Sequence, residues 1–210
     1  MTGLVRNAAL LTAAGLLAAS AAFAGVPSAA NSTVPSCIRL VGSKLGVADP
    51  VGTFSLTVRD LANNPLNGAS VVIDISGCTE LRICSDQLDA GATVNCAAKT
   101  TRKFTAATGV VTFTVLGGSG PAAATLLNGG KIYANGVLIG SPTVSAFDLD
   151  GAGGVGINDL SKWLGDLGSL QPYGRSDYDC SGGVGINDLS VWLGVLGGLA
   201  SQSSCAIACP

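Results

Sequence analysis

Two aspartate-rich stretches near the C-terminus have residue types and spacing suited to binding a hard cation. The first runs from Asp148 to Leu160 (DLDGAGGVGINDL), and the second, from Asp177 to Leu189 (DYDCSGGVGINDL), repeats it. Because the run GGVGINDLS is identical in both, the chain contains an internal duplication. Calcium prefers oxygen ligands, which a twelve-residue loop supplies from positions 1, 3, 5, 7 and 12, with glycine at position 6. The repeats therefore predict two calcium loops.

The loop numbering assigns the candidate ligands. In the first loop they are Asp148, Asp150, the carbonyl of Gly154, and Asp159. In the second loop they are Asp177, Asp179, Ser181, the carbonyl of Gly183, and Asp188. Position 5 is Ala152 in the first loop and has no side-chain oxygen there. We therefore expect one or two bound ions, with the second loop stronger, against the alternative of two aspartate-rich turns without metal. At position 8, Val155 and Val184 are placed to form a short β contact between paired loops.

Each loop leads into a segment with helical periodicity. The apolar residues follow the spacing i, i+3, i+4, i+7, which predicts one buried face on each helix: Leu160, Trp163, Leu164 and Leu167, then Leu189, Trp192, Leu193 and Leu196. Both tryptophans are expected to pack in the core. Glycines in these helices predict that they are short and weak without metal.

A duplicated loop–helix unit with no helix before the first loop differs from the full EF-hand plan. It resembles the type I dockerin module, and the resemblance covers residues 147–199. That resemblance implies calcium-dependent docking onto a cohesin-type protein domain. It places the partner contacts at loop positions 10 and 11 and on the following helix, here Ile157, Asn158, Lys162, Ile186 and Asn187. Since the two copies match, either could face a single partner.

The preceding part of the chain alternates apolar and polar residues in short runs, as half-buried strands do. Such runs centre on Leu56, Ile73 and Phe113, and the sequence Asn135-Gly136 has the residues of a type I′ hairpin turn. Phe54, Phe104 and Phe113 occupy core-type positions. The predicted fold class is mainly β with a small α tail: an immunoglobulin-like β-sandwich at 36–147 followed by the calcium-loop–helix module at 148–199.

Two segments of this β region resemble bacterial Ig-like repeats of the invasin/intimin (Big-1) type. They are TVRD at 57–60 with NPLNGASV at 64–71, and ATGVVTF at 107–113. The resemblance implies a spacer or adhesive module on a cell surface. Sugar binding is less favoured because Tyr133 is the only tyrosine before residue 147 and no tryptophan precedes it.

The N-terminus predicts export. Residues 1–24 contain Arg6, an apolar stretch and the sequence Ala22-Phe23-Ala24, which together are typical of a signal peptide. Residues 25–35 are predicted to be a linker, and residues 200–210 a cysteine-containing tail. No later apolar run is long and uninterrupted enough to span a bilayer.

Cysteine usage predicts disulfides in an exported protein. Cys37, Cys78, Cys84 and Cys96 form an even set that could make two bridges within the β region. Cys180, Cys205 and Cys209 form an odd set, which leaves one free thiol or a bond to another chain.

Composition excludes several enzyme classes. The chain has no histidine, which removes imidazole bases and histidine-bound zinc. Glu80 is the single glutamate, which argues against a paired-glutamate glycosidase. Eleven basic against thirteen acidic residues give no field that attracts nucleic acid.

We therefore predict a secreted, non-catalytic protein whose calcium-dependent tail attaches an Ig-like domain to a protein partner. The alternative is a calcium-stabilised structural or adhesive surface protein that self-associates. An accessory role in polysaccharide degradation is suggested only by the dockerin resemblance.

Overall fold

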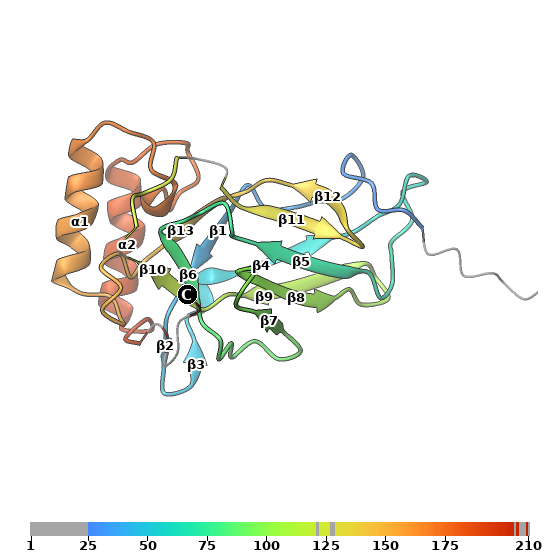
Figure 1. Cartoon of the computed structure of the whole chain (residues 1–210), viewed down its shortest axis with the longest axis horizontal. Helices are drawn as coiled ribbons and strands as arrows, with labels where there is room; N and C mark the ends of the chain where they lie inside the picture. Colours follow the sequence, from blue (N-terminus) through green and yellow to red (C-terminus); the bar gives the residue numbers. More distant parts are fainter. Residues whose placement is uncertain (1–24, 121, 127–128, 204, 206–208, 210) are drawn as a thin grey trace, which may run out of the picture.

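The computed structural model describes residues 25–210 except 121, 127–128, 204, 206–208 and 210; the predicted signal peptide lies outside the described residues. The chain is mainly β, and both α-helices follow the last strand (Figure 1). The strands are β1 (Cys37–Leu40), β2 (Ser43–Lys44), β3 (Val47–Ala48), β4 (Thr53–Thr57), β5 (Ser70–Asp74), β6 (Leu81–Ile83), β7 (Thr93–Asn95), β8 (Thr100–Phe104), β9 (Val110–Thr114), β10 (Gly117–Ser119), β11 (Lys131–Ala134), β12 (Val137–Gly140) and β13 (Thr143–Ala146). The helices are η1 (Pro50–Gly52), α1 (Ile157–Gly168), η2 (Gly174–Ser176) and α2 (Ile186–Gly198).

The largest sheet has five antiparallel strands in the order β12-β11-β5-β8-β7. Strands β4 and β9 form a separate antiparallel pair, in which Leu56 lies opposite Val111. Strand β1 runs parallel to β13, and β10 pairs with β6. The predicted turn between β11 and β12 is present, with positive φ at both Asn135 (45°) and Gly136 (81°), as a type I′ turn requires.

Alternating side chains from these sheets form the first hydrophobic core. Leu56, Ile73, Phe113 and Ile132 are at most 1% exposed and belong to one cluster. The predicted core position of Phe104 is wrong, because its side chain is 56% exposed. Phe104 is the last residue of β8, where the pleat turns it outward, and the Arg102 guanidinium lies 5.3 Å from its ring centroid.

The segment expected to be a linker lies along the β region. Thr33 forms a β bridge with Thr57, with N···O distances of 2.9 Å in both directions. Pro27 is bridged to Asp60, and the Ser28 amide donates to the Arg59 carbonyl at 2.8 Å. Residues 25–35 therefore extend the sheet at β4.

A second hydrophobic core joins the helices to one end of the β region (Figure 1). Trp163 of α1 and Trp192 of α2 are fully buried there, as predicted, together with Phe147 and Tyr178. The predicted buried face is too wide, however, because Leu164 and Leu193 are 51% and 48% exposed. In each helix the tryptophan is fully buried, and the leucine that follows it lies at the edge of the buried face.

All three disulfides connect the β region with the C-terminal part of the chain: Cys37–Cys180, Cys84–Cys205 and Cys96–Cys209. The expected pairing of four cysteines within the β region is therefore wrong. The odd cysteine belongs to the β region, since Cys78 is the free one and is buried. The expectation that a tail cysteine is free or bonds another chain is also wrong, because Cys180, Cys205 and Cys209 all find partners on strands or loops that the fold places beside them.

Candidate metal centre

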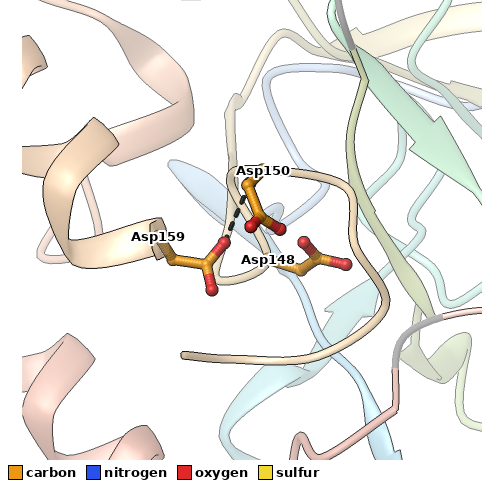
Figure 2. A group of neighbouring side chains, drawn as sticks. All are labelled: Asp148, Asp150 and Asp159. Atoms are coloured by element: carbon orange, nitrogen blue, oxygen red, sulfur yellow. Dashed lines mark hydrogen bonds between the residues drawn. The ribbon is translucent and has the colours of Figure 1, made fainter. Parts of the chain in front are cut away.

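The first aspartate cluster lies where the loop after β13 enters α1. Figure 2 shows Asp148 and Asp150 on the loop and Asp159 at the first turn of α1, with their carboxylates close together. One oxygen from each lies within 4.8 Å of the others. The Asp159 carboxylate accepts hydrogen bonds from the amides of Leu149 and Asp150, at 2.6 and 2.8 Å, which fold the loop back onto the helix.

The second cluster repeats this geometry before α2. Asp177, Asp179 and Asp188 also each offer an oxygen within 4.8 Å of the others. The Asp188 carboxylate accepts from the amides of Tyr178 and Asp179 at 2.6 and 2.9 Å. Both clusters therefore follow from local sequence, because the bonds that close each loop connect residues within one repeat.

The last aspartate of each loop also caps its helix. Asp159 accepts from the Gly156 amide at 2.7 Å, and Asp188 accepts from the Gly185 amide at 2.8 Å. An acidic side chain at the third helical position satisfies an amide that the helix leaves free, and its charge is favourable at the helix N-terminus. The same carboxylate therefore both closes the loop and caps the helix in each repeat.

Three carboxylate oxygens at this spacing fit a single cation. Calcium–oxygen distances are about 2.3–2.6 Å, so oxygens on opposite sides of one ion are about 5 Å apart. Each triad meets that limit, and two of its three aspartates are buried: Asp159 and Asp188 are 1% exposed, while Asp148 and Asp177 are 3% and 1% exposed. Buried carboxylates that converge without a nearby cation are costly, and a metal ion relieves that cost.

Burial and mutual repulsion of the aspartates also shift the pKa values of Asp159 and Asp177. Burial raises the pKa of Asp159, and the negative charge of Asp150 adds to the effect. Burial also raises the pKa of Asp177, with Asp188 and Asp179 contributing repulsion. Asp179 is the more exposed member, and a hydrogen bond from the Ser181 side chain lowers its pKa.

The other predicted ligands lie in the loops beside the triads. Ser181 contacts the Asp179 carboxylate through its side chain, and its amide donates to Asp177 and Asp179 at 3.1 and 2.9 Å. The Gly154 amide donates to Asp148 at 3.3 Å, while Gly183 follows Gly182, whose amide donates to Asp177 at 3.1 Å.

The expected β contact between the two loops at position 8 is replaced by another pairing. The Val155 amide donates to the carbonyl of Ser201 at 3.1 Å. The Ser201 hydroxyl in turn donates to Asp49 at 2.8 Å and accepts from the Gly42 amide at 3.1 Å. The chain after α2 therefore takes the place beside the first loop that a second loop was expected to fill.

The residues predicted to contact a partner are all exposed. Ile157 and Ile186 occupy equivalent positions at the start of α1 and α2 and are 74% and 75% exposed. Asn158, Lys162 and Asn187 are exposed as well. Three quarters of each isoleucine is open to solvent, so packing within the chain does not account for them.

Sequence reasoning missed two elements of the site, Tyr178 and the Cys37–Cys180 disulfide. The Tyr178 hydroxyl donates to the Ala146 carbonyl at 3.0 Å, and its own carbonyl accepts from Arg39 Nε at 2.7 Å. Both contacts join segments far apart in the sequence. The only sequence signal was the aromatic residue at position 2 of the second loop.

Comparison of the chain with protein-family models, curated proteins and solved structures finds no match. Among the residues that the structure describes, neither α-helix has the length and apolar character that a membrane span requires. The class that fold and site define is therefore a disulfide-linked, mainly β protein with two acidic clusters that could each hold a metal ion.

Proposed function

We propose that this protein is a secreted, non-catalytic binding protein whose two aspartate loops hold calcium and thereby present the starts of α1 and α2 to a protein partner. The observation that carries the proposal is the duplicated triad, whose oxygens lie within 4.8 Å of one another in both repeats. Calcium is the cation favoured by all-oxygen ligands in flexible loops. Three disulfides support an oxidising, extracellular location.

The proposed partner surface consists of exposed residues that occupy equivalent positions in the two repeats. Each loop ends in an aspartate that both binds the ion and caps the helix, so the ion fixes the position of the neighbouring exposed isoleucine. Ile157 and Ile186 are thus paired copies of one contact, next to Asn158 and Asn187. A dockerin-like role, with a cohesin-type domain as partner, fits this arrangement. The β region would then be an Ig-like spacer or adhesive module.

The first experiment is a calcium titration of the chelator-stripped mature protein, by calorimetry with far-UV circular dichroism alongside. Binding of one or two ions with a gain of helix is the expected result. No binding at millimolar calcium would contradict the metal-dependent part of the proposal.

Partner docking is tested on calcium-loaded protein with a cohesin-type domain as the probe. Ile157→Asp together with Ile186→Asp should abolish binding, because charge replaces both copies of the apolar contact. Leu45→Asp is the control for an added surface charge, since Leu45 is 95% exposed in the turn between β2 and β3. Equal binding by the double variant and the control would rule out this surface.

Self-association remains the second candidate, but the odd cysteine no longer favours it. Cys78 is 2% exposed and cannot reach another chain without unfolding. Sedimentation of the calcium-loaded protein separates the two: a monomer that binds its partner supports docking, and a concentration-dependent oligomer supports assembly.

A further inference from the structure

The two aspartate loops have the same backbone conformation at position 4 but different residues there. Gly151 has φ +72° in the first loop, and Cys180 has φ +65° at the same place in the second. Glycine adopts this left-handed conformation freely, whereas a residue with a β-carbon pays a free-energy cost. The backbone of the second loop therefore favours glycine at the position that Cys180 occupies.

Cys180 is bonded to Cys37 in β1, with the two Cα atoms 5.7 Å apart. Two residues further along β1, Arg39 Nε donates to the Tyr178 carbonyl at 2.7 Å. Strand β1 thus holds the second loop on both sides of Asp179. Asp179 is the most exposed carboxylate of its triad, and these two attachments restrain the backbone around it.

The anchoring strand is itself rigidly placed. Strand β1 pairs with β13, with Cys37 opposite Thr143 and Arg39 opposite Ser145. Its alternate residues Ile38 and Leu40 are buried at 1% and 0% exposure. A disulfide to such a strand fixes the loop before any ion arrives, which removes part of the ordering entropy that binding otherwise costs.

We propose that the Cys37–Cys180 disulfide is a positioning element of the second cation site, so that tight cation binding there depends on oxidation of these two cysteines. This inference rests on the proposed function. It makes the site fully competent only after the chain has entered an oxidising compartment, and it assigns Arg39 as a second positioning residue.

The same disulfide is the one most open to reductants. Neither Cys37 nor Cys180 is buried, whereas Cys84 and Cys209 of the other two bridges are 0% and 1% exposed. It lines a surface pocket together with Pro35, Arg39 and Phe54. A dithiol reductant would exchange with it, passing two electrons and two protons to Cys37 and Cys180 and ending as a cyclic disulfide.

The test measures calcium affinity at the second loop by calorimetry, with Asp159→Asn in every sample to silence the first loop. Cys37→Ser with Cys180→Gly removes the bridge and gives position 4 the residue of the first loop. This variant should bind calcium about 10- to 100-fold more weakly, as loss of supporting contacts does at other metal sites. Cys96→Ser with Cys209→Ser is the control, removing a disulfide that holds neither loop, and should bind as the parent does.

Near-UV circular dichroism of the buried tryptophans checks the fold of each variant. If the bridge variant does not fold, Arg39→Gln with the disulfide intact provides the second test and should also weaken binding. Parent-like affinity in the folded bridge variant, or in Arg39→Gln where that is the variant used, overturns the inference. Absence of calcium binding by the parent removes the proposed function as well, whereas parent-like binding by the variants removes only this inference.

Discussion

The ring of Phe147 stacks on the ring of Tyr178, with centroids 4.7 Å apart and planes inclined by 13°. Phe147 immediately precedes the first loop, and Tyr178 is the second residue of the second loop. The Trp192 indole also donates to the Phe147 carbonyl, at 3.3 Å. The two loops and α2 therefore meet at one buried contact, and the two aspartate clusters are joined through it.

Replacement of Tyr178 should separate its packing from its hydrogen bond. Tyr178→Phe keeps the stacked ring and loses the bond to Ala146, which should cost about 1 kcal/mol in the free energy of unfolding. Tyr178→Ala also leaves a cavity and should cost about 3–5 kcal/mol. Urea denaturation of the calcium-loaded protein measures both. Equal losses would mean that the stacked ring contributes little.

Single substitutions in the triads should remove ions one at a time. Asp159→Asn or Asp188→Asn replaces an oxygen that faces both the triad and a backbone amide, so the altered loop should lose its ion. Calorimetry should then show one site in place of two. The affinity left in Asp159→Asn should exceed that left in Asp188→Asn, because Ser181 contributes an oxygen where Ala152 cannot. The reverse order would contradict the ranking of the loops.

Chelation should destabilise the whole chain rather than release its tail. Val41 and Leu116, in the β region, pack with Trp163 and Trp192 in one core, and three disulfides cross the same boundary. Calcium at 100 times its dissociation constant raises the free energy of unfolding of the chain by about 2.7 kcal/mol for each occupied site. Its removal should lower the melting temperature by about 5–10 °C per site. Calorimetric scans with and without chelator test this, and a separate early transition confined to the helical signal would contradict it.

Cys78 should be unreactive in the folded protein. Burial raises the pKa of its thiol to about 12, and the negative charge of Glu80 adds to the effect. At pH 8 only about one thiol in ten thousand is then the reactive thiolate. A chromogenic disulfide reagent should detect no thiol in the native chain and one per chain in guanidinium without reductant. Three thiols per chain after unfolding would mean that one of the three disulfides is open.

Much of the candidate site could be predicted because it is local. Each triad is closed by hydrogen bonds within one repeat, such as those from Leu149 and Asp150 to Asp159, so residue types and spacing were enough. The strands around Leu56, Ile73 and Phe113 could be predicted for the same reason, because a half-buried strand alternates apolar and polar residues at consecutive positions.

The misjudged residues are those whose surroundings depend on distant segments. The helical periodicity predicts that α1 has an apolar face, but it does not predict how much of that face is covered. Leu164 belongs to the predicted face, yet it is half exposed. Phe104 fitted an alternating pattern, yet the pleat of β8 places it on the outward side of the strand, beside Arg102.

The duplicated loops, the helices that follow them and the β character of the rest could be read from the sequence, because these features depend on neighbours along the chain. Three pairings became visible only in the folded chain: Cys37 with Cys180, Val155 with Ser201, and Phe147 with Tyr178. Such pairings depend on which surfaces the packed sheets bring together, and no local pattern of residues carries that information.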